Sequence, residues 1–461
     1  MPLQAAYIFP HPPLAVPAVG GGQELKIKKT LASLDNAAQA IASLSPETII
    51  FITPHSTVYA DYFHISPGAK AKGDLSKFRA EDTIFSTGYD TELIAEICEL
   101  VSKNDIPAGC EGENDAALDH GFTVPMWFVN RRYTDYKSIR ISPSGLNKSQ
   151  HYRFGQCIKE AVDKSKKRVV IIASGDLSHK LSVEGPYGYA TEGTKFDAAI
   201  TEIFSQGDFL SLFNISELLR EKAAECGYNP FLILAGCLDR QKVNCDLMSY
   251  EGPFGVGYAV AGIIPGEADE SRNFLVQYEE IILKEARDCQ STEDAYRSLA
   301  RRSLEQVINT GTVLSLPTDL PDELINTKAG AFVTLYKQGR LRGCIGTIFP
   351  NTECVAEEII KNAVSAGLND TRFEPVTKSE LEYLNYKVDI LGTPERISNP
   401  LELDVKRYGV IVTSGYKRGL LLPNLEGIDT VAEQIEIARR KGGIRDDEEV
   451  ILERFEVTRH E

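Results

Sequence analysis

The sequence of 461 residues predicts two domains of different classes, an α/β domain followed by an α+β domain. In the first half, short runs rich in Val and Ile alternate with longer amphipathic stretches, which is typical of a central sheet covered by helices. In the second half, two helical stretches precede a group of short strands. The length agrees with two domains, because a single hydrophobic core stops growing at roughly 250–300 residues.

The first domain is assigned to residues 1–265. Its strands are expected where short apolar runs occur, at 5–9, 48–53, 168–173, 244–250 and 255–263. Its helices are expected where amphipathic stretches occur, at 24–43, 90–103, 149–164, 191–205 and 216–238. Ligands of open α/β sheets bind beyond the carboxyl ends of the strands. Polar residues just past these strands are therefore the first candidates for a functional site.

The second domain is assigned to residues 272–461, after a Gly-, Pro- and acid-rich segment at 262–272 that is interpreted as a linker. Two helical stretches open it, and the second begins with a Ser-Thr-Glu-Asp sequence typical of a helix cap. The sequence AGAFVTLYKQGRLRGCIGTI predicts a hairpin that turns at KQGR. Further strands are expected at 383–391 and 408–413, and a last helix at 430–441.

Charge and composition argue against several classes of protein. The net charge of −16 leaves no basic stripe of the kind that a general nucleic-acid binder needs. No apolar run reaches the roughly 18 residues of a membrane span, and the first residues lack a basic signal-peptide region, so a cytoplasmic protein is expected. The nine cysteines contain no C-x-x-C pair and are expected to be reduced, mostly buried thiols.

Three strand-like runs of the first domain each end on a residue that can bind a metal. His11 follows YIFP, His55 follows IIFITP, and Glu251 follows CDLMSY. Two imidazoles and one carboxylate form the 2-His-1-carboxylate set that holds an iron-type divalent ion on one face. Neighbouring prolines stiffen the two histidine loops. Each residue also has a plainer interpretation, as a structural histidine or, for Glu251, a solvated turn carboxylate.

A metal site of this kind also needs residues that handle protons. His179 in SGDLSHK and His120 in LDHGFTVP are the candidates, because a neutral imidazole accepts or donates a proton near pH 7. Asp176 and Asp119 lie close to them in sequence and could orient the rings. The alternative for Asp176 is a helix N-cap, since Gly-Asp-Leu-Ser-His is similar to a strand-to-helix turn.

The motifs FPHPP, TPHS, DHG, SGDLSH and EGPFGVGY, in this order, resemble the LigB-type class III extradiol dioxygenase family over most of the first domain. The resemblance implies a three-layer α/β domain with a central, mostly parallel or mixed sheet. It implies Fe(II) at the positions of His11, His55 and Glu251, with Zn or Mn as alternatives. His179 would be the acid/base and His120 a substrate contact.

The activity implied by this resemblance is extradiol cleavage of a catecholic or aminophenolic ring, an oxidoreductase reaction of aromatic compound metabolism. The related Memo proteins share the scaffold and use a cysteine near the glutamate position. The presence of Glu251 places this chain on the dioxygenase side of that division.

In the second domain, LRGCIGTIFP places Cys344 on an expected strand, where Arg342 could lower the pKa of its thiol and make it a nucleophile. A buried structural thiol is the better interpretation, because the only histidine after residue 272 is His460. LRGCIGTI, SAGLNDTRFEPV, LGTPERI and GLLLPNLEGIDTVAEQIEIARRKGGI resemble the AMMECR-type domain, whose role is undefined. Asp370 and Arg372 could line a pocket with Arg342 or form salt bridges.

The two halves together resemble the AmmeMemoRadiSam system, in which dioxygenase-like, AMMECR-type, Memo-like and radical-SAM components occur together. This implies radical-SAM and Memo-like protein partners, and LigB-type domains often pair, so a homo-oligomer is expected. A radical-SAM partner implies oxygen-poor chemistry. The alternative function is therefore a metal-dependent, oxygen-independent component of a modification system, or an adaptor with a vestigial metal site.

Overall fold

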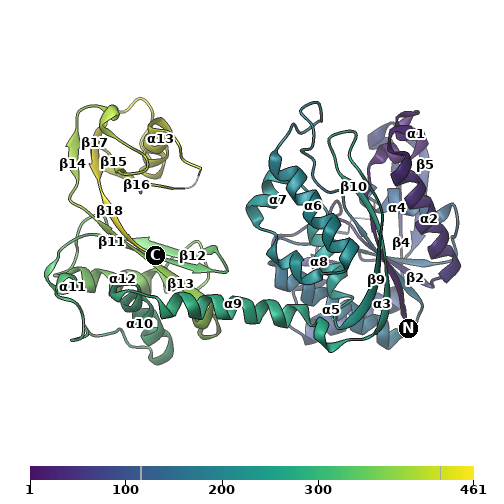
Figure 1. Cartoon of the computed structure of the whole chain (residues 1–461), viewed down its shortest axis with the longest axis horizontal. Helices are drawn as coiled ribbons and strands as arrows, with labels where there is room; N and C mark the ends of the chain where they lie inside the picture. The colour runs from purple at the N-terminus through teal and green to yellow at the C-terminus, as the bar shows by residue number, and fades with distance from the viewer. Residues whose placement is uncertain (115–116, 426) are drawn as a thin grey trace. The chain divides into compact units, whose positions relative to one another are not determined.

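The computed structural model describes residues 1–114, 117–425 and 427–461, and it is an α/β fold followed by an α+β fold. The chain divides into two compact units, Met1–Tyr278 and Glu279–Glu461. The division falls inside helix α9, Phe274–Ser291 (Figure 1). Within the described residues, no helix is long and apolar enough to cross a membrane.

The segment interpreted as a linker from its composition is mostly a strand. β10 runs over Tyr258–Ala268, and the short helix η5 over Glu270–Arg272 follows it. β10 pairs with β1 only as far as Ile263, so Pro265 lies where no N–H is required on that side of the strand. The glycine and proline residues of 262–272 predicted a linker between domains, but they lie in the last part of β10.

Unit 1 is built on a six-stranded mixed sheet in the order β7-β2-β8-β1-β10-β9. Its parallel strands are β1 (Leu3–Phe9), β2 (Thr48–Ile52), β7 (Lys137–Ile141) and β8 (Val169–Ser174). β10 is antiparallel to β1, and the edge strand β9 (Gln241–Glu251) is antiparallel to β10. Every residue of β2 and β8 is buried, as expected for strands covered on both faces.

Helices cover both faces of this sheet. They are α2 (Lys28–Leu44), α3 (Thr91–Lys103), α4 (His120–Asn130), α5 (Lys148–Ser165), α6 (Thr191–Gln206), α7 (Glu217–Ala223) and α8 (Tyr228–Gly236). α2 packs with α4 on one face, and α5 packs with α8 on the other (Figure 1). Smaller elements are α1 (Pro17–Gly20), β3 (Phe63–His64), β4 (Lys70–Leu75), β5 (Ala80–Gly88) and β6 (Ala108–Gly109).

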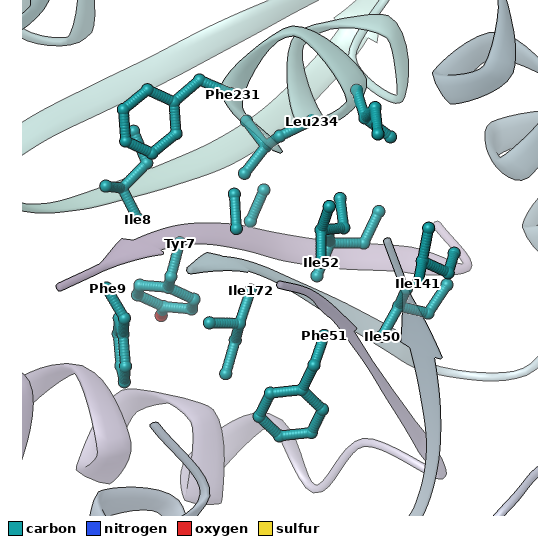
Figure 2. Packing of buried hydrophobic residues seen from close by; sticks show 14 of the residues in the cluster. Tyr7, Ile8, Phe9, Ile50, Phe51, Ile52, Ile141, Ile172, Phe231 and Leu234 are labelled. Atoms are coloured by element: carbon teal, nitrogen blue, oxygen red, sulfur yellow. The ribbon is translucent and has the colours of Figure 1, made fainter. Parts of the chain in front are cut away.

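The core of unit 1 follows from the alternation of side chains along the strands. Figure 2 shows Ile8 pointing toward Phe231 and Leu234 of α8, whereas its neighbours Tyr7 and Phe9 point to the opposite face. All five side chains are buried. Since successive residues of a strand face opposite ways, a strand between two helical layers must be apolar throughout.

The predicted helix at 216–238 is two helices, α7 and α8, separated by residues 224–227. Ala224 adopts a left-handed φ of 53° and ends α7. Pro230 explains the break, because a proline inside a continuous helix lacks the N–H and clashes with the carbonyl four residues before it. That residue is Cys226, which therefore lies in a loop.

Unit 2 contains two four-stranded sheets, β12-β11-β13-β18 and β14-β17-β15-β16. The strands of the first sheet are β11 (Ala331–Lys337), β12 (Arg340–Gly346), β13 (Leu384–Leu391) and β18 (Val457–His460). Those of the second are β14 (Glu395–Ile397), β15 (Gly409–Ser414), β16 (Lys417–Leu421) and β17 (Ile451–Phe455). The predicted hairpin turns through Gln338 and Gly339, which both have positive φ, as a type I′ turn requires.

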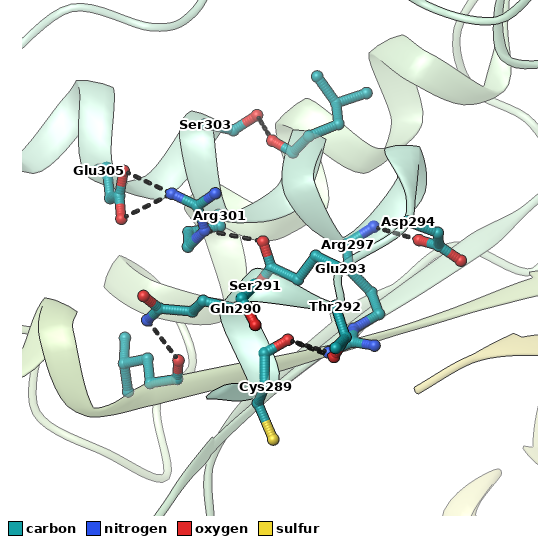
Figure 3. A network of polar contacts seen from close by, with 12 residues as sticks. Cys289, Gln290, Ser291, Thr292, Glu293, Asp294, Arg297, Arg301, Ser303 and Glu305 are labelled. Carbon is teal, nitrogen blue, oxygen red and sulfur yellow. Dashed lines mark hydrogen bonds and ion pairs between the residues drawn. The ribbon is translucent and has the colours of Figure 1, made fainter. Parts of the chain in front are cut away.

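The other helices of unit 2 are α10 (Ala295–Thr310), α11 (Asp322–Asn326), α12 (Val355–Leu368) and α13 (Val431–Lys441). Asp294, the last residue of the predicted Ser-Thr-Glu-Asp cap, accepts a hydrogen bond from the Arg297 N–H at 3.0 Å (Figure 3). In the same network Arg301 pairs with the buried Glu293 at 2.8 Å and with Glu305 at 3.3 Å. These contacts fix the start of α10.

Candidate metal centre

Three neighbouring parallel strands deliver three histidines to one edge of the sheet. β8 lies between β1 and β2, and all three run in the same direction. His11 follows the end of β1, His55 follows β2, and His179 follows β8. The loops that begin at these strand ends converge, as ligand sites of α/β sheets generally do.

Two of these histidines and one cysteine bring their ligand atoms together. The Nε2 atoms of His11 and His55 are 3.0 Å apart, and the Cys226 Sγ lies 3.5 Å from the His11 Nε2. These three residues form a group whose ligand atoms all lie within 4.8 Å of one another. Donors that share a tetrahedral zinc-sized ion are separated by about 3.3 Å for two nitrogens and about 3.6 Å for nitrogen and sulfur. The His11–His55 and His11–Cys226 separations are therefore close to those of donors that share one metal ion.

Close contact between two glycines brings Cys226 to this site. A Cβ on Gly175 would lie 2.2 Å from the Cα of Gly227, so neither loop tolerates a side chain there. The Gly227 N–H donates to the Asp176 carbonyl at 3.1 Å, which joins the Cys226 loop to the loop after β8. The sequence-based prediction did not include Cys226. Pro230 indicates that Cys226 lies in a loop, but nothing in the sequence indicates that this loop reaches the site.

Ser174 orients the His11 ring. Its Oγ lies 2.8 Å from the His11 Nδ1, and both side chains are buried. This contact leaves the Nε2 directed at the site, in the manner of the outer partners that fix metal-binding histidines. The sequence did not indicate Ser174, and the orienting residues that it suggested, Asp176 and Asp119, were assigned to the rings of His179 and His120.

Asp176 instead holds the backbone of the His11 loop. Its Oδ1 accepts the His11 N–H at 2.9 Å, and no helix begins at Asp176, so the N-cap alternative is wrong. Burial raises the pKa of Asp176 to about 7, against the lowering effect of that hydrogen bond. The Asp176 carboxylate therefore holds the backbone of the loop that carries His11, rather than orienting an imidazole ring.

His120 lies against both metal-binding imidazoles. It is the first residue of α4, its ring stacks on His55 with centroids 4.1 Å apart, and it meets the edge of His11 at 5.2 Å. Asp119 caps α4 by accepting the Phe122 N–H at 3.1 Å, and it accepts the Thr53 hydroxyl at 2.6 Å. Asp119 therefore positions the start of α4 and the loop before His55.

His179 lies on the loop that follows β8. Its Nε2 is 3.9 Å from the Cys226 Sγ, and Tyr187 stacks on its ring with centroids 5.1 Å apart. The His179 N–H donates to the Ala223 carbonyl at 3.0 Å, which ties this loop to the end of α7. The structure thus gathers His11, His55, His120 and His179, as the sequence predicted, and adds Cys226.

Burial keeps the imidazoles neutral. It lowers the pKa of His11 well below its ordinary value, and the neighbouring histidines add to this effect. It likewise lowers the pKa of His120 to about 3 and of His179 to about 4. Burial also raises the pKa of the Cys226 thiol. Neutral imidazoles carry the lone pairs that a metal needs, and a bound cation would favour the thiolate of Cys226.

Glu251 is not brought into this group. It ends β9, at the edge of the sheet, and β10 separates that strand from β1. Its Oε1 accepts the Thr30 N–H at 2.7 Å and the Thr30 hydroxyl at 2.9 Å. Glu251 therefore joins β9 to α2. The sequence predicted a different role for it, as the third ligand of the metal.

A cavity of about 450 Å³ is lined by the same loops. Leu14 comes from the loop after His11, and Ser182 and Pro186 come from the loop after His179. Phe254 and Tyr258, from the β9–β10 turn and the start of β10, give the cavity an aromatic wall. This volume suits a small organic molecule, and His55 is exposed, so the site is open to solvent.

In unit 2, the structure separates Arg342 from Cys344. Arg342 occupies a bulge of β12, where the register shifts between Leu341 and Gly343, and it binds Glu380 through its Nε at 3.0 Å. Burial raises the pKa of the Cys344 thiol. This direction agrees with the preferred interpretation of Cys344 as a structural thiol and gives no support to the alternative in which Arg342 activates it. A bulge reorients the side chains of a strand, which spacing in the sequence does not reveal.

Asp370 and Arg372 form the salt bridge that the sequence left as one of two alternatives, with Nη2 and Oδ2 2.6 Å apart. Asp370 also accepts the Cys344 N–H at 2.9 Å. The hydrogen bond from Arg372 holds the pKa of the Asp370 carboxyl well below its usual range. Arg372 also lines a groove with Cys344, but Arg342 and Asp370 are not among the lining residues, so the structure does not show the pocket that these three residues were suggested to share.

Comparison with known proteins matches each half of the chain to a family. Residues 5–261 match the catalytic LigB subunit of aromatic ring-opening dioxygenase, and residues 297–460 match AMMECR1. A protein of Clostridium acetobutylicum is 42% identical over 100% of this chain and 99% of its own length. A protein of Thermotoga maritima is 47% identical over 36% of this chain and 98% of its own length.

Two solved structures are also similar. An uncharacterized protein from Pyrococcus horikoshii is 33% identical over 36% of this chain and 88% of its own, with a TM-score of 0.32. An uncharacterized protein from Escherichia coli is 15% identical over 57% of this chain and 99% of its own, with a TM-score of 0.39.

Proposed function

Because this chain belongs to the family of catalytic LigB subunits of aromatic ring-opening dioxygenases, with an AMMECR1 domain joined to it, we propose that unit 1 is a mononuclear metal-dependent enzyme that acts on a small hydroxylated aromatic molecule. The observation that carries the proposal is the convergence of the His11, His55 and Cys226 ligand atoms. Three protein ligands that leave further positions open are typical of catalytic metal sites.

The third ligand narrows the choice of metal. A thiolate favours zinc or iron, whereas manganese prefers oxygen ligands. Cys226 in place of the expected Glu251 therefore supports zinc or Fe(II) and disfavours manganese. When bound, such an ion supplies Lewis acidity, and iron also supplies redox chemistry toward oxygen.

The surrounding residues have separate roles in this proposal. His179 is the candidate to accept a proton from a substrate hydroxyl, because it lies next to Cys226 on the loop that lines the cavity. His120, stacked on His55, would contact the substrate ring. Phe254 and Tyr258 would hold the apolar part of the substrate.

The proposal is tested by metal analysis of anaerobically purified protein and three variants. We expect about one zinc or iron per chain in the wild type and little metal in His11→Ala and Cys226→Ser. The matched variant Glu251→Gln should retain the metal, because Glu251 binds Thr30 instead. Circular dichroism verifies that each variant is folded. A Cys226→Ser protein with wild-type metal affinity would contradict the assignment.

The presence of Cys226 among the candidate ligands supports a second candidate reaction. The oxygenase set expected from the sequence contains a carboxylate, whereas Cys226 supplies a soft thiolate that zinc accepts. Zinc is not redox-active, so a zinc-containing site would support a reaction without oxygen, such as a step in a radical-SAM-linked modification system. Oxygen uptake with a panel of catechols and aminophenols separates the two. Uptake with ring opening supports the dioxygenase, whereas bound zinc without uptake supports the oxygen-independent reaction and directs the search to radical-SAM and Memo-like partners.

A further inference from the structure

Unit 2 contains a groove of about 650 Å³ that the function proposed for unit 1 does not use. Residues of both four-stranded sheets and of α13 line it. Phe332, Tyr336 and Leu422 form apolar surface, and Cys344 is also part of the lining. The volume falls within the roughly 300–1,000 Å³ of small-molecule sites.

The groove is basic although the whole chain has a net charge of −16. Its cationic lining residues are Arg372, Lys387, Arg418, Lys441 and Arg459, and its only acidic lining residue among those described is Asp389. Arg372 pairs with Asp370, Lys387 with Glu461, and Arg459 with Asp389. These pairs neutralise three of the cations.

Arg418 and Lys441 have no carboxylate within ion-pair distance in the described part of unit 2. Arg418 donates from its Nε to the Thr413 hydroxyl at 3.1 Å and lies over the Phe349 ring, 5.2 Å from its centre. A Cβ on Gly442 would lie 2.8 Å from the Arg418 carbonyl carbon, so β16 and the end of α13 are in direct contact. Arg418 and Lys441 therefore belong to adjacent backbone segments, and both line the groove.

The last turn of α13 contains three basic residues, Arg439, Arg440 and Lys441. Basic residues are common at this position because they interact favourably with the helix dipole. Here Arg439 donates to the carbonyls of Arg445 and Glu448, and Arg440 pairs with Glu436 at 3.8 Å. Of these three residues, Lys441 is the one that lines the groove.

We propose that this groove binds a small organic oxyanion with a flat apolar body. The carboxylate or phosphate contacts Arg418 and Lys441, and the apolar body lies against Phe332, Tyr336 and Leu422. Guanidinium and ammonium groups form charge-assisted hydrogen bonds with both kinds of oxyanion. A concave groove of this size suits a small molecule better than a nucleic acid, which needs an extended basic surface.

Calorimetric titration of the full chain tests the proposal with three probes, phenyl phosphate, phenylacetate and the neutral phenylacetamide. We expect the two anions to bind at least about tenfold more tightly than the amide, since charged hydrogen bonds are worth about that factor each. The tighter of the two anions identifies phosphate or carboxylate as the preferred group.

Paired substitutions locate the binding. Arg418→Gln with Lys441→Gln should weaken anion binding by at least about tenfold. The control, Arg440→Gln with Lys361→Gln, removes the same charge from exposed positions of α13 and α12 outside the groove. It should change binding by less than about twofold.

Protection of Cys344 from alkylation is an independent measurement. N-ethylmaleimide modification is followed by peptide mass spectrometry, with the exposed Cys289, which does not line the groove, as the internal control. Saturating phenyl phosphate or phenylacetate should slow modification of Cys344 and leave that of Cys289 unchanged. Equal binding of the amide, equal losses in both double variants, no protection of Cys344, or binding of a short single-stranded RNA alone would each overturn the proposal.

Discussion

The orientation of His11 depends on one buried hydroxyl. Ser174 lies at the end of β8, and its Oγ meets the His11 Nδ1 at 2.8 Å. Partners of this kind typically contribute a factor of about 10–100 to metal affinity. Ser174 is therefore a positioning residue, which acts through the His11 ring.

We expect Ser174→Ala to weaken zinc binding by about 10–100-fold, measured by competition with a chromophoric chelator. The control is Ser138→Ala, which removes another buried hydroxyl, bonded to Thr87 at 2.7 Å in a different part of unit 1. Both variants should lose about 1 kcal/mol of stability. Only Ser174→Ala should lose zinc affinity, and equal affinities would contradict the role assigned to Ser174.

Individual residues of the site differ in how well the sequence predicts them. His11 and His55 were predictable, because each follows an apolar run that forms a buried parallel strand. Cys226 was not, because it reaches the site through the close approach of Gly175 and Gly227, residues far apart in the chain. Glu251 was assigned from its place after a strand-like run and from the family resemblance, and only the structure shows that its carboxylate accepts hydrogen bonds from Thr30.

Among the elements, the short helix η6 (Lys378–Tyr383) carries a carboxylate that joins it to the β11–β12 hairpin. Glu380 binds Arg342 at 3.0 Å and Lys337 at 2.9 Å, and it completes a capping box with Thr377. Burial raises the pKa of Glu380, but these contacts outweigh burial and lower the pKa to about 2. The ionised carboxylate therefore stabilises unit 2.

When folding lowers the pKa of a carboxyl group, the ionised group stabilises the folded state. This contribution is fully present above the pKa of the unfolded state, and it is lost as pH falls through the pKa of the folded state. For Glu380 that window runs from its ordinary value of 4.5 down to about 2. We expect Glu380→Gln to destabilise unit 2 by about 2 kcal/mol at pH 7 and by less at pH near 3. Urea unfolding followed by circular dichroism measures both.

The matched control is Glu382→Gln in the same helix. Glu382 is half exposed and lies 3.8 Å from Arg287, so its loss should change stability by less than about 0.5 kcal/mol. A pH-independent effect of Glu380→Gln would show that shape, rather than ionisation, accounts for its contribution.

Elements with a strong local pattern were predictable, and those that depend on distant contacts were not. The hairpin β11–β12 follows from its KQGR turn, and α10 from its cap. The sequence predicted one helix over 216–238. Pro230 is a local signal for its division into α7 and α8. β14 and β17 pair across more than 50 residues, and such pairing leaves little trace in the sequence.

At the scale of the whole molecule, the two units have separate hydrophobic cores, and the single tryptophan reports on only one of them. Trp127 lies in α4 of unit 1, packed against that unit's core. Its fluorescence therefore follows the unfolding of unit 1, whereas circular dichroism follows both units.

We expect zinc to raise the midpoint of the fluorescence transition, because a ligand that binds only the folded state stabilises it by about 2.7 kcal/mol at a hundredfold excess over Kd. The unfolding of unit 2, which circular dichroism follows and Trp127 does not report, should keep the same midpoint. In the Cys226→Ser variant the fluorescence shift should be lost. An equal shift of both units on adding zinc would contradict a site confined to unit 1.

If unit 1 binds a metal as proposed, the separation of the three candidate ligands along the chain has a consequence for how the protein acquires that metal. His11 and His55 are 44 residues apart, and Cys226 follows His11 by 215 residues. At synthesis rates of about 5–20 residues per second, the thiol leaves the ribosome roughly 10–40 s after the first imidazole. A nascent chain thus presents two nitrogens without the sulfur. An ion can be held by all three donors only after the loops of the finished sheet have closed, so metal loading marks the end of folding in unit 1.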